Sequence, residues 1–195
     1  MIFLVRHGES DWNVARRTQG QAAHPRLTEV GRAQARAVAD ALFAELGPAA
    51  VTTIVSSDLA RAVQTAEIIA GVTGAGVRTD PRLREQSLGT LEGLGYEESL
   101  AAGSALDWSD PDVRPGGGES PREVAARMTA ALSDLPQESI TVVVSHGDAI
   151  RCALVGRSGG AFGGEWIEVP NGSAAVLDGD EPVRWLAVAR PVTPR

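Results

Sequence analysis

Residues 2–8 read Ile-Phe-Leu-Val-Arg-His-Gly, and residues 140–147 read Ile-Thr-Val-Val-Val-Ser-His-Gly. Each segment is a run of aliphatic and β-branched residues, followed by a polar residue and then by His-Gly. Short apolar runs of this kind predict strands that are buried in a sheet. His7 and His146 would therefore each lie just past the end of a strand.

The rest of the chain alternates short apolar runs with amphipathic segments, which predicts a sheet flanked by helices. Further strands are expected at residues 51–55, 174–177 and 183–188, with the last two near a sheet edge. Helices are expected from Thr28 to Leu46, from Ser57 or Asp58 to Ala70, from Glu119 to Leu135, and from Asp148 to Val155. Residues 79–118 are rich in Gly, Pro and acidic residues and predict a long irregular excursion with one short helix.

Composition narrows the classes of function. A chain of 195 residues with 43% hydrophobic residues is long enough for one domain with a sizeable core. The net charge of −7 argues against nucleic acid or an anionic membrane as the main partner. Cys152 is the only cysteine, so no intramolecular disulfide can form. No stretch approaches the roughly 20 apolar residues of a membrane helix, and we expect a cytoplasmic protein.

All 18 basic residues are arginine, and the chain contains no lysine. A phosphate-binding loop that needs a lysine is therefore excluded, as is a Schiff base with pyridoxal phosphate. The same absence means that arginine must fill solvated surface positions. A lone arginine in this chain is consequently weak evidence of a site.

The two His-Gly pairs are the strongest candidates for a functional site. In an open α/β sheet, ligands bind outside the carboxyl ends of the strands, where His7 and His146 are expected. Gly8 and Gly147 would let backbone N–H groups approach a ligand closely. A single histidine in such a place is more often a turn or packed residue, but two in matched settings favour a site.

Two further segments supply candidates. Arg61 falls in the first turn of the helix after the predicted strand 51–55, so its guanidinium can reach the same rim beside a helix N-terminus. Guanidinium groups suit phosphate oxygens. Glu85 and Glu92, in the segment that follows, are candidates for proton transfer, although a glutamate beside arginines is often only a surface ion pair.

The segment Arg6-His7-Gly8-Glu9-Ser10, followed by Trp12-Asn13, strongly resembles the signature of the histidine phosphatase superfamily, whose best-known branch includes the cofactor-dependent phosphoglycerate mutases. Further motifs of the family follow in its order: Thr18-Gln19-Gly20-Gln21, Leu27-Thr28, Ser56 to Arg61, Leu83 to Gly93, Gly117 to Ser120, and Val144 to Gly147. The resemblance implies a three-layer α/β/α sandwich around a mostly parallel sheet. It also implies a single domain over residues 1–195, with residues 94–118 as an irregular lid over the active site.

The resemblance implies a role for each matching residue. His7 is the expected nucleophile, which forms a phosphohistidine, and Glu85 is the expected proton donor, with Glu92 as the lesser candidate. The residues expected to hold the phosphate or the rest of the substrate are Arg6, Asn13, Gln19, Gly20, Arg61, His146 and Gly147. Two guanidiniums and an imidazolium would stabilise the transferring phosphoryl group without Mg²⁺, so we expect no metal and no cofactor.

The choice between phosphatase and mutase depends on the lid. Residues 95–115 carry a single basic residue, Arg114, against Glu97, Glu98, Asp107, Asp110 and Asp112. An acidic lid suits bisphosphoglycerate poorly, because like charges repel. We therefore predict hydrolysis of a small phosphomonoester, such as a sugar phosphate or a phosphoglycerate-like metabolite.

Three alternatives stay open: mutase-type phosphotransfer, a phosphate-binding module without catalysis, and, least favoured, a metal site on His7 and His146. The expected partner is the phosphorylated metabolite, with no nucleic acid and no membrane. The sequence does not decide the oligomeric state, and a homodimer is left open.

Overall fold

The computed structural model describes residues 1–47, 50–136, 138–160, 162, 167–179 and 181–189. Six strands form one sheet in the order β3-β2-β4-β1-β5-β6. The first four of these, β3 (Gly76–Thr79), β2 (Thr53–Ser56), β4 (Thr141–Ser145) and β1 (Ile2–Arg6), are parallel. The remaining two, β5 (Ala174–Leu177) and β6 (Arg184–Trp185), run antiparallel to their neighbours. The sheet is therefore mostly parallel, as predicted.

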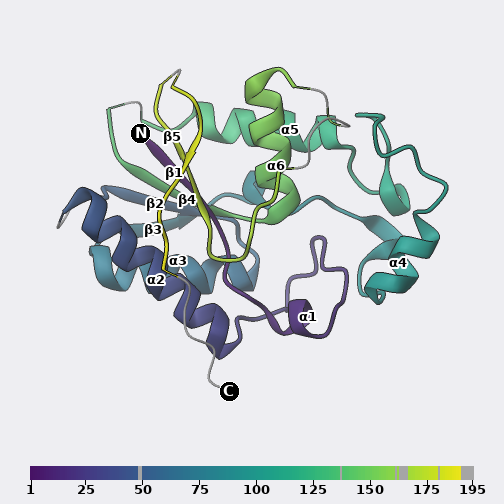
Figure 1. Ribbon diagram of the computed structural model, residues 1–195, viewed down its shortest axis with the longest axis horizontal. Helices are drawn as coiled ribbons and strands as arrows, with labels where there is room; N and C mark the ends of the chain where they lie inside the picture. Colours follow the sequence, from purple (N-terminus) through teal and green to yellow (C-terminus); the bar gives the residue numbers. More distant parts are fainter. Residues whose placement is uncertain (48–49, 137, 161, 163–166, 180, 190–195) are drawn as a thin grey trace.

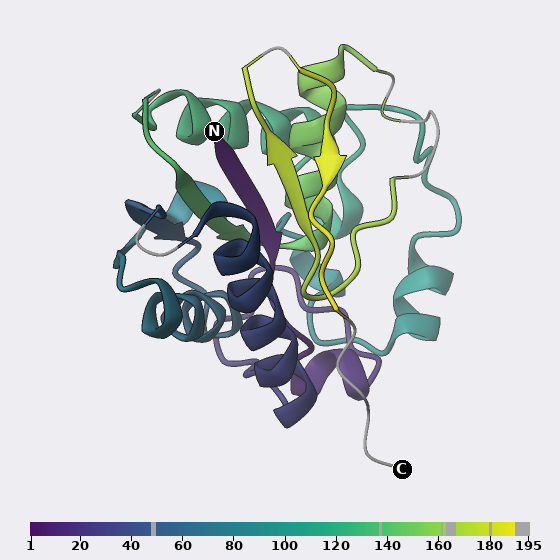
Figure 2. The ribbon, with the colours of Figure 1, turned by 60° about the vertical axis from the view of Figure 1, so that its left-hand side comes forward.

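Helices cover both faces of this sheet. Helices α2 (Glu29–Leu46) and α3 (Ala60–Thr73) lie on one face, and α5 (Pro121–Ser133) and α6 (Gly147–Ser158) lie on the other (Figures 1 and 2). The shorter elements are α1 (Asp11–Val14), α4 (Tyr96–Ala102) and the 3₁₀ turns at Pro81–Leu83, Gly89–Leu91 and Pro115–Gly117. The three-layer α/β/α sandwich is confirmed.

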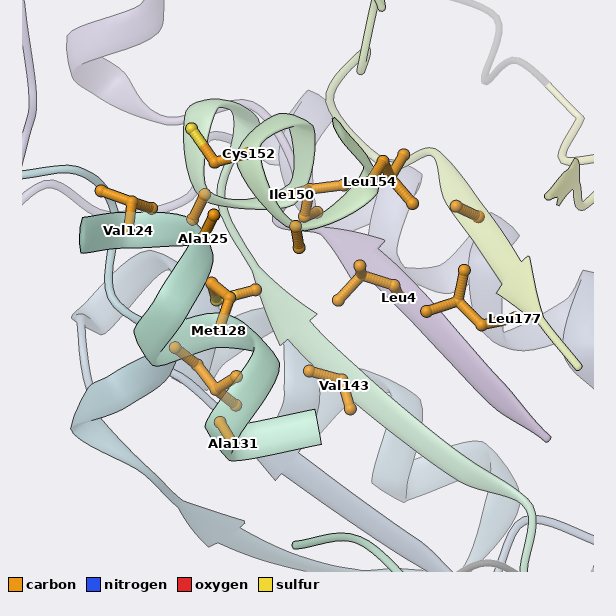
Figure 3. Close-up of a cluster of buried hydrophobic side chains, with 14 of the residues drawn as sticks. Leu4, Val124, Ala125, Met128, Ala131, Val143, Ile150, Cys152, Leu154 and Leu177 are labelled. Atoms are coloured by element: carbon orange, nitrogen blue, oxygen red, sulfur yellow. The ribbon is translucent and has the colours of Figure 1, made fainter. Parts of the chain in front are cut away.

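Alternate residues of the central strands enter two separate cores, because successive side chains of a strand point to opposite faces. Leu4 and Val143 pack with Met128 and Ile150 under α5 and α6 (Figure 3). Their chain neighbours, among them Phe3, pack under α2 and α3. The aliphatic runs of the sequence are continuous because both faces of β1 and β4 are covered.

Helix boundaries follow local sequence signals where those signals are strong. Thr28 caps α2 by accepting from the N–H of Gly31, and the helix ends at Gly47, as predicted. Ser120 and Glu123 form a capping box at the start of α5, whose first residue is Pro121.

Several predicted boundaries were wrong. Neither Ser57 nor Asp58 caps α3, whose N-cap position is Leu59 without a side-chain cap, and that helix runs on to Thr73. Strand β3 was missed, because all four of its residues are exposed and show no apolar pattern. The last strand is only Arg184–Trp185, rather than 183–188, although β5 and β6 do lie at one end of the sheet, as expected.

The segment 94–118 contains one short helix, α4, as predicted, together with the 3₁₀ turn Pro115–Gly117. It is tied to the segment after α1 by backbone hydrogen bonds from Thr18 to Leu94 and from Tyr96 to Arg16. None of the helices in the described ranges combines the length and apolar character that crossing a bilayer requires.

Candidate active site

The ends of β1 and β4 bring the two histidines together. The strands are parallel neighbours in the register Arg6–Ser145, and the N–H of His7 donates to the carbonyl of Ser145 at 3.1 Å. The next residues, His7 and His146, therefore leave the sheet side by side, with ring centroids 5.1 Å apart and planes at 62°. Both side chains are buried.

The protonation of His7 is set by its neighbour Gly8. The Nδ1 atom of His7 lies 2.7 Å from the carbonyl oxygen of Gly8, and a carbonyl can only accept, so Nδ1 carries the hydrogen. Nε2 consequently keeps its lone pair, as a nucleophile must. Burial, together with the charges of Arg61 and Arg6, holds the pKa of His7 well below its ordinary value of 6.5. The ring is therefore neutral at physiological pH.

His146 is oriented by a residue that sequence reasoning had assigned only to a helix cap. Its Nε2 lies 2.8 Å from the hydroxyl of Ser57, which is buried in the turn between β2 and α3. Burial first, and then the charge of Arg61, hold the pKa of His146 well below 6.5. The expected imidazolium is therefore a neutral imidazole before an anion binds.

Arg61 enters the site from the first turn of α3 and is fully buried. Its terminal nitrogens donate to the carbonyls of Ala22 (2.9 Å) and Gly20 (2.8 Å). Gly20 has φ +46°, and a Cβ there would lie 2.4 Å from Oε1 of Glu92. Burial lowers the pKa of Arg61 to about 10, so the guanidinium remains charged at neutral pH.

Arg6 lies at the other side of the histidine pair, where its NH1 donates to the carbonyl of Val169 at 2.6 Å. The backbone of Gly147 runs alongside it, since a Cβ at Gly147 would lie 3.3 Å from Cζ of Arg6. A larger residue at position 147 would thus push against this guanidinium.

Three buried nitrogens of this group have no hydrogen-bond partner among the described residues: Nε of Arg6, Nε of Arg61 and Nδ1 of His146. Each arginine Nε carries a hydrogen, and buried donors are nearly always paired in native proteins. Electrostatic coupling of His146 with Arg61, His7 and Arg6 indicates that the groups lie close together. A bound oxyanion would supply the acceptors that the two arginine N–H groups lack.

Glu85 meets the site at the N-terminus of α6. Its carboxylate accepts from the backbone N–H groups of Asp148 (3.2 Å) and Ala149 (2.9 Å). Burial first, and then the charge of Asp148, raise the pKa of Glu85, against the lowering effect of hydrogen bonds from Gln86 and Ala149. A carboxyl that stays protonated to higher pH than usual is suited to donate a proton.

Glu92 has a different place. Its Oε1 accepts from the N–H groups of Gln21 (3.1 Å) and Leu88 (2.9 Å), and from the hydroxyl of Ser87 (3.4 Å). These contacts join the 18–22 loop to the 87–92 loop, so Glu92 holds backbone in position.

Asn13 and Gln19 are linked through Ser10. Asn13 forms a capping box with Ser10 at α1, and the hydroxyl of Ser10 also lies 2.9 Å from Oε1 of Gln19. Asn171, which was not singled out from the sequence, donates to the carbonyl of His7 at 3.1 Å and contacts Asn13 at 3.4 Å. The two predicted substrate contacts thus belong to the network around the His7 loop.

Sequence reasoning also missed the side chains that hold the backbone of Glu85 in place. Arg127 on α5 donates to the carbonyls of Arg82, Arg84 and Glu85, and it pairs with the carboxylate of Glu119 at 2.8 Å. Gln21 donates to the same carbonyl of Glu85 and to Glu119. Only the placement of Glu119 in the Gly117 to Ser120 motif hinted at such a role.

A cavity of about 190 Å³ opens beside Glu85. It is lined by Arg6, Glu85, Gly147, Asp148, Arg151, Ile167, Glu168, Val169 and Pro170. Within the described residues, no three His, Cys, Asp or Glu side chains gather as metal ligands would.

Comparisons with known proteins show which family the chain resembles. A relative from Proteus mirabilis named "Probable phosphoglycerate mutase GpmB" is 47% identical over 161 residues, which are 78% of this chain and 72% of the relative. The relative of the same name from Enterobacter sp. is 40% identical over 95% of this chain and 87% of its own.

Among solved structures, a mycobacterial glucosyl-3-phosphoglycerate phosphatase matches with a TM-score of 0.74 and 35% identity, over 89% of this chain and 87% of that one. Bacillus stearothermophilus YhfR matches with a TM-score of 0.78 and 29% identity, over 98% of this chain and 97% of that one. The family model of the histidine phosphatase superfamily (branch 1) matches residues 2–188, and the chain belongs to this family of enzymes.

Proposed function

We propose that the chain is a phosphatase that hydrolyses a small phosphomonoester through a phosphohistidine on His7. The single observation that carries this proposal is the set of unpartnered nitrogens on Arg6, Arg61 and His146 beside the free Nε2 of His7. A phosphoryl group in this position has its oxygens matched by donors and its phosphorus next to a nucleophile. Positioning and charge stabilisation of this kind supply most of the catalysis in phosphoryl transfer.

In the first step, Nε2 of His7 attacks phosphorus and the bond from phosphorus to the leaving oxygen breaks. Glu85 gives its proton to that oxygen, and the alcohol departs. In the second step, a water attacks the phosphohistidine, Glu85 takes the proton of the water, and the nitrogen–phosphorus bond breaks. Inorganic phosphate leaves, and His7 and Glu85 return to their starting protonation states.

In the proposed reaction the leaving oxygen lies opposite Nε2 of His7, because the attacking and leaving atoms are in line, and next to Glu85, which must reach it to give it a proton. The cavity that Glu85 lines therefore receives the alcohol part of the substrate. Its volume of about 190 Å³ favours a small metabolite over a macromolecule. The likeness to a glucosyl-3-phosphoglycerate phosphatase supports a phosphoglycerate-like substrate.

The proposed reaction uses no metal, because the groups around the site are arginine and neutral histidine. Arginine charges would repel a cation there, and they already supply the positive charge that Mg²⁺ provides in other phosphoryl-transfer enzymes.

The test is phosphate release from p-nitrophenyl phosphate in EDTA. We expect turnover by the wild type and its loss in His7→Gln, whereas His24→Gln, which removes an exposed histidine, keeps it. Activity that requires an added divalent cation would overturn the metal-free reaction. Binding of inorganic phosphate without turnover of any phosphomonoester would identify a binding module instead.

Mutase-type phosphotransfer is the second candidate, because relatives at 40–47% identity carry that name. It predicts isomerisation of 3-phosphoglycerate when the enzyme is primed with bisphosphoglycerate. The phosphatase reading predicts release of inorganic phosphate under the same conditions, so following both products separates the two.

A further inference from the structure

Ser57 lies in the turn between β2 and α3 and contacts one of the two histidines of the site. It is fully buried after β2, and its hydroxyl oxygen has two hydrogen-bond contacts: Nε2 of His146 at 2.8 Å and the N–H of Leu59 at 3.3 Å. The hydroxyl therefore meets one obligatory donor, the peptide N–H, and one ring nitrogen that can act either way.

Counting hydrogens favours one role for the ring, because only that role gives the hydroxyl hydrogen of Ser57 an acceptor among the described residues. The N–H of Leu59 can only donate, so it uses a lone pair of the Ser57 oxygen. The hydroxyl has a single hydrogen, and the acceptor within reach is Nε2 of His146. When the hydroxyl donates to Nε2, the hydrogen of the neutral ring must sit on Nδ1.

We propose that Ser57 is a positioning residue, which holds His146 in the Nδ1–H tautomer so that this N–H points at the transferring phosphoryl group. Nδ1 of His146 is buried without a partner among the described residues, and so are the Nε atoms of Arg6 and Arg61. In the opposite tautomer, Nδ1 would present a lone pair to phosphate oxygens and repel them. The hydroxyl thus turns a histidine that can either donate or accept into a fixed donor.

The same tautomer then serves two purposes in one site. Gly8 fixes the hydrogen of His7 on Nδ1, which frees Nε2 to attack. Ser57 fixes the hydrogen of His146 on Nδ1, where this N–H group donates to the phosphoryl oxygens. The catalytic consequence rests on the proposed function, but the tautomer does not.

The direct test is the ¹⁵N NMR spectrum of the histidine rings in the ligand-free protein. The chain has three histidines, so His7→Gln and His24→Gln spectra leave the His146 signals assigned. We expect Nδ1 of His146 to show the shift of a nitrogen that bears hydrogen, and Nε2 that of a bare one. In Ser57→Ala we expect intermediate shifts, as the two tautomers mix. A wild-type ring with hydrogen on Nε2 would overturn the proposal.

Steady-state kinetics test whether this tautomer of His146 contributes to catalysis, with Ser56→Ala as the matched control. Ser56 is equally buried, but its hydroxyl donates to the carbonyl of Ser57 and does not reach His146. We expect Ser57→Ala to lower kcat about tenfold or more, short of the roughly 10²–10³-fold loss seen when a stabilising donor is deleted outright. KM should change less, because the donor matters most as charge develops on the phosphoryl oxygens. Ser56→Ala should keep the wild-type tautomer and kcat.

Failure of the proposed function and failure of this inference give different results. If the wild type releases no phosphate but the tautomer shifts in Ser57→Ala, the phosphatase proposal fails and the positioning role stands. If the wild type is active and Ser57→Ala changes neither tautomer nor kcat, the positioning role is refuted.

Discussion

The rings of His7 and His146 lie 5.1 Å apart, and the charges of Arg61 and Arg6 act on both rings. Burial and those charges keep both pKa values well below 6.5. As pH falls below 6.5, the two histidines of the unfolded chain bind up to two more protons than those of the folded chain, so they make the free energy of unfolding rise with pH in this range. As pH falls from 6.5, each histidine removes up to about 1.4 kcal/mol of stability per pH unit.

Glu85 has the opposite effect on the pH dependence of stability. Its raised pKa lets the folded chain keep a proton above pH 4.5, where the unfolded chain has lost it. The contribution of Glu85 to the free energy of unfolding therefore falls as pH rises. Because one carboxyl opposes two histidines, it only partly offsets their effect on the slope. Urea unfolding at several values between about pH 5 and pH 7 measures the slope. The double variant His7→Gln/His146→Gln should flatten it, and an unchanged slope would show that other groups cause the pH dependence.

Glu85→Gln should separate proton donation from binding. We expect kcat for an alkyl phosphate to fall about 10²–10⁴-fold, the usual worth of a general acid, because an alkoxide leaves poorly without a proton. The fall for p-nitrophenyl phosphate should be far smaller, because nitrophenolate leaves readily unprotonated. The amide oxygen can still accept from Ala149 at the start of α6, so part of the helix cap survives.

Glu92→Gln is the matched control for this experiment. Its carboxylate bonds to loop N–H groups rather than to the start of α6. We expect the ratio of the two kcat values to stay at the wild-type level, even if stability falls. A ratio that changes in Glu92→Gln and not in Glu85→Gln would reverse the two assignments.

How far the sequence predicts this molecule depends on how local each signal is. The strands β1 and β4 and the cap at Thr28 were predicted because a few adjacent residues are enough to show a buried strand or a capping side chain. The meeting of His7 and His146 followed from one rule about strand ends. Strand β3 was missed because an exposed edge strand needs no apolar pattern.

The support around the site could not be predicted, because it is built from contacts distant in sequence. From the sequence, Ser57 was a candidate for a helix cap. Only the fold shows that its hydroxyl contacts His146, which is 89 positions away in the sequence. Arg127 is one of many arginines in a chain without lysine, so nothing local marked it as different from a surface residue.

The close approach of Gly8 to Gly31 should make Gly8→Ala destabilising. A Cβ at Gly8 would lie 2.1 Å from the carbonyl oxygen of Gly31, and both groups are backbone, so neither yields easily. We expect a loss of about 1–3 kcal/mol or more, the range for overpacking. Gly71→Ala in α3 is the control, because a Cβ there meets open space. It should gain about 0.5–1 kcal/mol, and urea midpoints that move in the same direction for both variants would contradict the packing argument.

Arg127→Met should be costly for both stability and catalysis. The methionine fills similar space, but the carbonyls of Arg82, Arg84 and Glu85 lose their donor. Burial raises the pKa of the Glu119 carboxyl but the hydrogen bond from Arg127 outweighs it and lowers the pKa, and this carboxylate loses its ion-pair partner too. We expect a loss of about 2–4 kcal/mol, since a largely buried charge would be left unpaired.

The matched control is Arg122→Met on the same helix, whose ion pair with Asp112 is 61% exposed on both sides. It should cost less than about 1 kcal/mol, because water screens the pair. At a temperature where Arg127→Met remains folded, its kcat for alkyl phosphates should still fall, since the Glu85 backbone is no longer held. Equal stability losses in the two variants would mean that Arg127 is only another surface arginine. A normal kcat in folded Arg127→Met would mean that Glu85 keeps its place without this support.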